Sequence, residues 1–161
     1  MSNKIVAYKE NEELMMIVPA PDFKGDISSL APDDAEWYIF NKNDVPKIRT
    51  MREAFDIEHK LDGSGAKIII NGEKAKDITR KRIEKESRAF ILGLTEIERR
   101  LQRESIMSGD EQKYKDFFQN VVSMAENAHN DRRISEAQTV EELEKIDPIA
   151  EIEGSNLQDY I

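Results

Sequence analysis

Cysteine is absent from the 161-residue sequence, and only two histidines are present. Without cysteine, a disulfide framework, thiol catalysis and cysteine-type zinc sites are excluded. The histidines, His59 and His129, have no second histidine at metal-ligand spacing, so we expect structural or solvent-facing roles for both. No Gly-x-Ser-x-Gly motif and no glycine-rich phosphate loop occurs. We therefore expect no enzymatic activity, no metal and no cofactor.

Long apolar runs are also missing. No stretch approaches the roughly 18 apolar residues that a membrane span requires, and the first residues lack the apolar region of a signal peptide. We therefore expect no membrane partner and a chain that is made in the cytoplasm. Charged residues make up 35% of the sequence, against 39% hydrophobic residues, so the core must be small or shared with partners.

Charge is unevenly distributed along the chain, whose formal net charge is −9. Residues 1–71 carry 9 basic and 13 acidic side chains, residues 72–107 carry 10 and 7, and residues 108–161 carry 5 and 13. The middle segment alone is net basic. This pattern favours a hairpin in which the basic segment meets the acidic one, and it disfavours non-specific nucleic-acid binding by the whole chain.

The first part of the chain has the pattern of a small antiparallel β domain. Two short apolar runs, at residues 4–9 and 14–19, flank a polar turn and predict a β-hairpin. The aromatic run at residues 37–40 predicts a third strand. Residues 55–60 alternate between apolar and polar, and residues 66–70 are rich in β-branched side chains. The two segments predict a second hairpin.

A long amphipathic helix is predicted over residues 72–107. Its apolar residues recur at spacings of three, four or seven, which lines them up on one face. Asn71 is the expected N-cap, and Ser108-Gly109 is the expected end. A helix of this length must bury its apolar face against another helix, in this chain or in a second copy.

A second amphipathic helix is predicted over residues 110–128, and the short connection to it predicts an αα-hairpin. Thr139 and Glu142 have the spacing of a capping box and predict a short helix through Ile146. The sequence thus predicts an α+β fold with a small antiparallel β domain (1–71), a helical hairpin with a short C-terminal helix (72–146) and an acidic tail (147–161). The residues expected at the hairpin or oligomer contact are Ile83, Phe90, Leu94, Ile97, Leu101, Tyr114, Phe117 and Val121.

The basic residues of the long helix suggest an alternative function. Seven lysine and arginine side chains fall between residues 74 and 88, a density that suits a phosphate backbone. Three acidic residues interrupt them and Glu73 precedes them, however, and no aromatic residue lies among them to stack on bases. We therefore regard a solvated or protein-contacting face as the better interpretation.

Two short stretches resemble proteins encoded in the tail and tail-fibre regions of tailed-phage genomes. The first, residues 45–55 (VPKIRTMREAF), looks like the Pro-x-x-Arg-x-Phe-Arg-x-Ala-Trp segment of these proteins. In them a β-hairpin follows, and then a helix whose start is similar to residues 74–78 (KAKDI). The second stretch, residues 131–143 (DRRISEAQTVEEL), is similar to their Arg-Ile-x-x-Ala-x-Thr-x-Glu-Glu-Leu ending. The resemblance covers roughly residues 44–148, and Gly93 and the acidic tail depart from it.

This resemblance implies a structural or assembly protein of the phage tail, located in the virion and made in the host cytoplasm. It implies no catalytic residue, and its partners would be further copies of the chain and other tail or fibre proteins. Two alternatives remain open at this point. One is a tail-fibre assembly chaperone that is absent from the mature virion, and the other is a phage-encoded protein that binds nucleic acid or a host factor.

Overall fold

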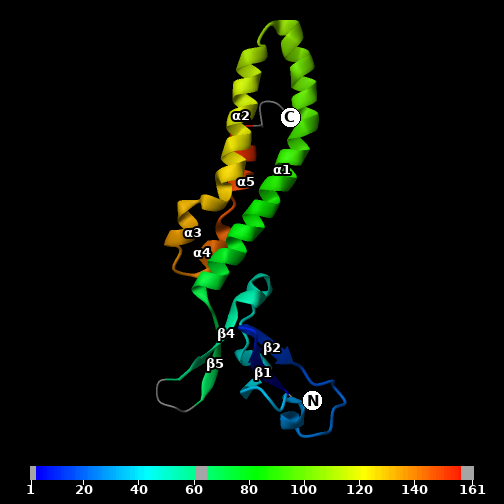
Figure 1. Cartoon of the computed structure of the whole chain (residues 1–161), viewed down its shortest axis with the longest axis vertical. Helices are drawn as coiled ribbons and strands as arrows, with labels where there is room; N and C mark the ends of the chain where they lie inside the picture. Colours follow the sequence, from blue (N-terminus) through cyan, green and yellow to red (C-terminus); the bar gives the residue numbers. More distant parts are fainter. Residues whose placement is uncertain (1–2, 61–64, 157–161) are drawn as a thin grey trace. The chain divides into compact units, whose positions relative to one another are not determined.

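The computed structural model describes residues 3–60 and 65–156, without the side chains of residues 95–98, 101, 105, 155 and 156. It has an α+β fold in which antiparallel strands precede the helices, so the expected fold class is confirmed (Figure 1). The chain divides into two compact units, Met1–Ala75 and Lys76–Ile161.

The first unit contains two small antiparallel sheets. The strands are β1 (Lys4–Glu10), β2 (Glu13–Ile17), β3 (Trp37–Asn41), β4 (Phe55–His59) and β5 (Ala66–Ile70). One sheet has the order β2-β1-β3, and the other pairs β4 with β5. The hairpin between β1 and β2 closes through Asn11 and Glu12, both at positive φ, as a two-residue type I′ turn requires.

The core of the first unit is formed by one face of these strands. Period-two alternation puts Ile5 and Ala7 of β1 on the same face, and Ile5 pairs directly with Phe40 of β3. The buried cluster consists of Ile5, Ala7, Phe40, Phe55, Ile57 and Ile68. Short 3₁₀ helices connect the strands: η1 (Ile27–Leu30), η2 (Lys42–Asp44) and η3 (Arg49–Ala54).

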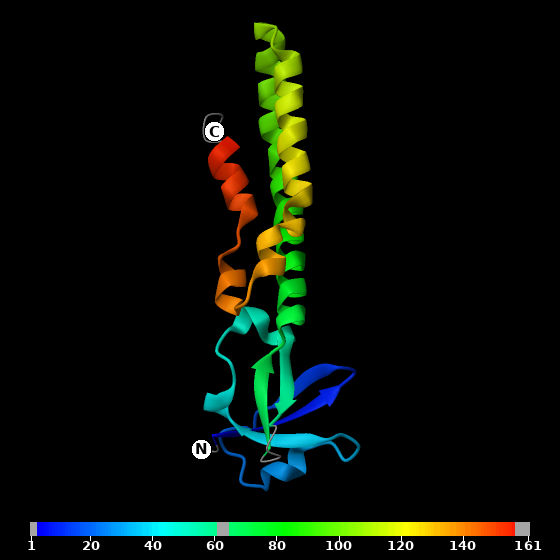
Figure 2. The same ribbon diagram turned by 90° about the vertical axis from the view of Figure 1, so that its left-hand side faces the viewer.

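The helices are α1 (Gly72–Ser108), α2 (Glu111–Asn127), α3 (Arg132–Glu136), α4 (Val140–Lys145) and α5 (Pro148–Asn156), with a 3₁₀ turn, η4 (Ala128–Asn130), after α2. Asn71 caps α1 as expected, because its Oδ1 accepts the N–H groups of Glu73 and Lys74 at 3.1 and 3.2 Å. At the other end Gly109, at φ +78°, turns the chain into α2. Figures 1 and 2 show α2 returning along α1.

The acidic tail expected from residue 147 onward is wrong for residues 148–156, which form α5. Pro148 occupies the first helical turn, and Asp147 Oδ1 accepts the N–H of Ala150 at 3.1 Å, so the helix has a capped start. Ile149 and Ile152 are buried, with 7% and 6% of their surface exposed, and α5 packs against α2. The apolar contact with α2 stabilises a segment whose overall acidity suggested a tail.

The expected capping box at the start of α4 is confirmed. The N–H of Glu142 donates to Thr139 Oγ1, and the N–H of Thr139 donates to Glu142 Oε2, both at 3.2 Å. The short helix then runs from Val140 to Lys145, with Leu143 buried. Residues 132–136, for which no helix was expected, form α3.

Candidate protein-binding groove on the helical hairpin

A buried polar contact joins the two long helices. Ser87 on α1 is 4% exposed, and its hydroxyl donates to the carbonyl oxygen of Ala125 on α2 at 2.6 Å. The Ala125 carbonyl lies in the last turn of α2, where helix carbonyls need partners from outside the regular hydrogen-bond pattern. The small side chains of Ser87 and Ala125 allow the helices to approach closely here. This contact fixes the register of α2 against α1.

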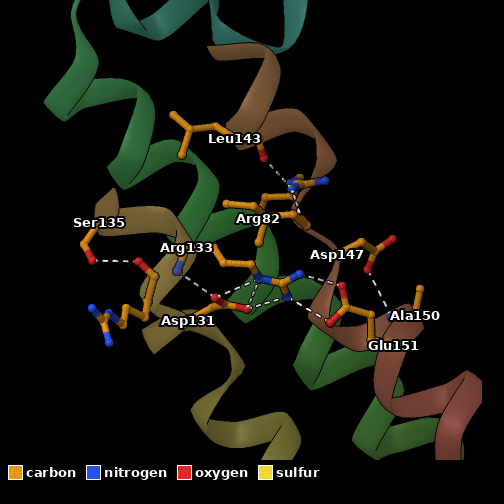
Figure 3. A network of polar contacts seen from close by, with 10 residues as sticks. Arg82, Asp131, Arg133, Ser135, Leu143, Asp147, Ala150 and Glu151 are labelled. Atoms are coloured by element: carbon orange, nitrogen blue, oxygen red, sulfur yellow. Dashed lines mark hydrogen bonds and ion pairs between the residues drawn. The ribbon is translucent and has the colours of Figure 1, made fainter. Parts of the chain in front are cut away.

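Arg82 connects α1 to the end of α4, as Figure 3 shows. Its Nη2 donates to the carbonyl oxygen of Ile146 at 2.7 Å and approaches that of Leu143 at 3.5 Å. A cation at the carboxyl end of a helix satisfies unpaired carbonyls and interacts favourably with the helix dipole. Arg82 therefore holds a segment that lies about sixty residues further along the sequence.

A second arginine ties α3 to α5 (Figure 3). The Arg133 guanidinium donates to Asp131 from Nε and Nη2, and to Glu151 at 2.7 and 2.9 Å. Hydrogen bonds from Arg133 hold the pKa of Asp131 below its usual range, and the two carboxylates together raise the pKa of Arg133. Asp131 also caps α3 by accepting the N–H of Arg133. This ionic cluster positions α3 against α5.

Further from these contacts the two long helices enclose an open groove, which we call the hairpin groove. It has a volume of about 620 Å³. Its described lining residues are Ile91, Leu94, Gln102 and Ile106 from α1, with Glu111, Tyr114, Lys115, Phe118, Gln119 and Val122 from α2. Six of the ten described lining residues are apolar or aromatic, and the other four are polar or charged, which is a composition typical of a protein-contact site.

Exposed apolar side chains accompany the groove. Ile106, which lines it, is 64% exposed, and the neighbouring Met107 is 90% exposed. Leu92, 75% exposed, lies on the same helix but outside the lining. Exposed apolar residues beside an apolar groove are a common feature of protein–protein contact surfaces.

The residues expected at the hairpin or oligomer contact do not all lie in the same environment. Ile83 and Val121 are 0% exposed and belong to the core of the chain itself. Phe90 and Phe117 are half-buried, and the Phe117 ring meets Phe118 edge-on with 5.7 Å between centroids. Of the expected set, Leu94 and Tyr114 line the groove. The side chains of Ile97 and Leu101 lie outside the described residues.

Sequence reasoning did not select several lining residues. Phe118 and Val122 belong to the apolar pattern of the second helix, so a full tally of that pattern would have found them. Ile91 flanks the main apolar face of α1, and Ile106 lies five residues after Leu101 and off that face, so periodicity selects neither. Ser87 gave no signal, because a serine in a helix pattern is ordinarily assigned to the polar face.

The basic residues of α1 are largely engaged within the chain. Arg80 pairs with Asp77, and Arg88 pairs with Glu84, both at 2.7 Å. Arg82 binds the carbonyl groups described above. Contacts within the chain therefore engage several of the cations that could otherwise follow a phosphate backbone.

The described residues give no support for a metal site or a membrane-spanning helix. They contain no group of three or more His, Asp or Glu side chains arranged to hold a metal ion. No helix in the described part of the chain is long and apolar enough to cross a membrane. Comparison with protein-family models, curated proteins and solved structures found no match. The candidate function therefore rests on the hairpin groove and on the resemblance of residues 44–148.

Proposed function

We propose that the chain is a structural protein that oligomerises, with the hairpin groove of one copy receiving the long helices of a second copy. The observation that carries this proposal is the apolar groove between α1 and α2, with Ile106 exposed on its lining. Two hairpins that face each other form a four-helix arrangement, in which the exposed apolar residues of each copy are covered.

Charge favours a second copy as the occupant. Residues 89–125, which contain the groove, carry five basic and six acidic side chains, although the whole chain has a net charge of −9. Two copies therefore meet at this segment without the repulsion that acidic surfaces would produce. The mixed charges around the groove also allow Lys115 and Glu111 of one copy to pair with opposite charges of the other.

The resemblance of residues 44–148 supplies the biological setting of the proposal. It supports a protein of the tail or tail-fibre region of a tailed phage, which docks to other tail components and is present in the virion. The alternative is a fibre-assembly chaperone with the same contacts but no place in the finished particle. Mass spectrometry of purified particles of the encoding phage separates the two, because only the structural protein is found in them.

Oligomerisation is tested with a matched pair of substitutions, Ile106→Glu and Leu92→Glu. Both residues are exposed apolar side chains of α1, but only Ile106 lines the groove. Each variant adds one negative charge, and neither removes a core residue. Analytical ultracentrifugation over a concentration series measures the self-association of each variant.

We expect the unmodified chain to self-associate and Ile106→Glu to weaken association about thirtyfold or more, as a loss of roughly 2 kcal/mol produces. Leu92→Glu should associate like the unmodified chain. A chain that stays monomeric at every concentration refutes oligomerisation. Equal loss in both variants shows that the groove is not the contact.

A further inference from the structure

A second hollow lies within the first unit, and the function proposed above does not use it. We call it the cationic pocket. It has a volume of about 720 Å³. Its lining residues are Met16, Lys42, Val45, Pro46, Lys47, Arg49, Arg52 and Phe55. Most of them belong to the 45–55 stretch that the sequence analysis singled out.

The local backbone explains why this stretch forms a pocket. Pro46 restricts Val45 to extended backbone, at φ −76° and ψ 131°, and Ile48 is extended as well. The chain therefore leaves η2 without entering a sheet and returns through η3 to β4. This path places basic side chains around an apolar floor made of residues from β2, β4 and the loop.

The four basic side chains of the pocket are not neutralised within the described residues. Lys42, Lys47, Arg49 and Arg52 are exposed, and none of them makes an ion pair or side-chain hydrogen bond there. No carboxylate among the described residues lines the pocket. In a chain with a net charge of −9, four unpaired cations around one hollow form a local site for negative charge.

The nearest acidic residues in sequence form no ion pair with these four side chains among the described residues. Asp44 accepts a hydrogen bond from Asn41 Nδ2 at 3.2 Å. Glu13 and Glu53 line a neighbouring hollow that shares Met16 and Arg52 with the cationic pocket, but neither carboxylate lines the cationic pocket itself. The cations are therefore available to a ligand, and the two arginines offer the forked geometry that matches carboxylate groups.

The floor of the pocket indicates what kind of anion fits. Met16, Val45 and Pro46 are half-buried apolar residues that supply contact area for an apolar side chain. Phe55 is only 3% exposed, so its ring face is not available to stack on a base. Cations around an aliphatic floor suit an acidic protein segment with an apolar anchor better than they suit a nucleic acid.

We propose that the cationic pocket is a docking site for an acidic segment of a partner protein, which places one apolar side chain on the floor and its carboxylates against Arg49, Arg52 and the two lysines. This interaction is separate from the hairpin groove, and it stands whether or not the chain oligomerises. A protein with both sites joins copies of itself through α1 and α2 and holds a different component through the first unit.

The proposal is tested by fluorescence anisotropy with the full chain and a labelled acidic peptide in which one leucine is flanked by glutamates (EELEE). Binding should weaken between about 50 mM and about 300 mM salt, because the contacts are electrostatic and exposed. The double variant Arg49→Gln/Arg52→Gln should weaken binding about tenfold, since two exposed charged contacts of roughly threefold each multiply.

Lys24→Gln/Lys60→Gln is the matched control, because both lysines are exposed residues of the same unit outside the pocket and the change in net charge is the same. It should bind the peptide within about twofold of the unmodified chain. Replacing the leucine of the peptide by alanine should weaken binding about fivefold if the floor receives the anchor. Circular dichroism confirms that each variant is folded.

Three results would overturn the proposal. The first is no binding of the peptide at about 50 mM salt. The second is an equal loss in both double variants, which shows a general effect of net charge. The third is displacement of the peptide by a single-stranded oligonucleotide or by inorganic phosphate at lower concentration than by unlabelled peptide, which identifies a nucleic-acid or phosphate site instead.

Discussion

Replacing Arg82 by methionine tests whether this residue organises the second unit. In the structure the Arg82 guanidinium donates to the Ile146 carbonyl at 2.7 Å, at the carboxyl end of α4. Methionine retains the apolar contacts of the arginine stem and removes the charge and the donors. The control is Lys81→Met, because Lys81 is the adjacent, exposed cation of the same helix.

The expected loss follows from two contributions. A hydrogen bond from a charged donor contributes roughly 1.5–3 kcal/mol, and the interaction of a cation with a helix terminus adds about 0.3–1 kcal/mol. Arg82 is only half-buried, so solvent screening reduces both. We therefore expect Arg82→Met to lower the free energy of unfolding by about 1.5–3 kcal/mol and Lys81→Met to change it by less than about 0.5 kcal/mol.

Urea unfolding followed by far-ultraviolet circular dichroism measures these changes, because every α-helix of the described chain begins at Gly72 or later. Amide hydrogen exchange adds a local readout. In Arg82→Met the amides of α4 should lose protection before those in the middle of α1, since α4 loses its anchor. Equal stability of the two variants, together with unchanged protection of α4, would contradict this role of Arg82.

Three further predictions concern the stability of variants at Leu94, at the glycines Gly93 and Gly109, and at Asp131. Leu94→Asp should cost several kcal/mol in urea unfolding, since Leu94 is 3% exposed and an unpaired charge would be buried; a variant of unchanged stability would contradict this packing. Gly93→Ala should stabilise the chain by about 1 kcal/mol, because alanine favours a helix and the added Cβ meets no atom. Gly109→Ala should destabilise the chain, because Gly109 has a φ of +78° that alanine rarely adopts. Thermal denaturation should show a higher melting temperature for the first variant and a lower one for the second. Asp131 has a folded pKa below its ordinary value of 3.8 because of its hydrogen bonds with Arg133, so its contribution to stability is complete above about pH 4 and is lost as the pH falls further. The free energy of unfolding, measured at pH 7 and at about pH 3, should therefore fall less for Asp131→Asn than for the unmodified chain. Equal losses in the two proteins would contradict this.

Local signals in the sequence were sufficient for the strands, the two long helices and α4, but not for α3 and α5. Apolar periodicity predicted the long helix that the structure shows as α1, and Asn71 caps it as expected. Thr139 and Glu142 form the capping box that their spacing indicated. Such features depend on residues within a few positions of one another, so the sequence alone determines them.

The candidate sites could be recognised only from contacts between residues that are far apart in the sequence. A serine at position 87 shows no preference for a core position until the Ala125 carbonyl lies opposite to it. Arg82 belonged to a basic cluster in the sequence, and the structure assigns it to the end of α4. The 45–55 stretch was identified by resemblance, but only the fold showed that its basic residues surround an apolar floor.

By itself, then, the sequence determined the α+β class, the strands, the two long helices and the caps at Asn71 and Thr139, because each is encoded by short-range spacing and capping chemistry. The tertiary structure decided that residues 148–156 are a helix rather than a tail, since burial of Ile149 and Ile152 overrides the acidic composition of that segment. It also decided where the hairpin groove and the cationic pocket lie. Both depend on which side chains meet across elements and which remain uncovered, and this is a property of packing that periodicity does not contain.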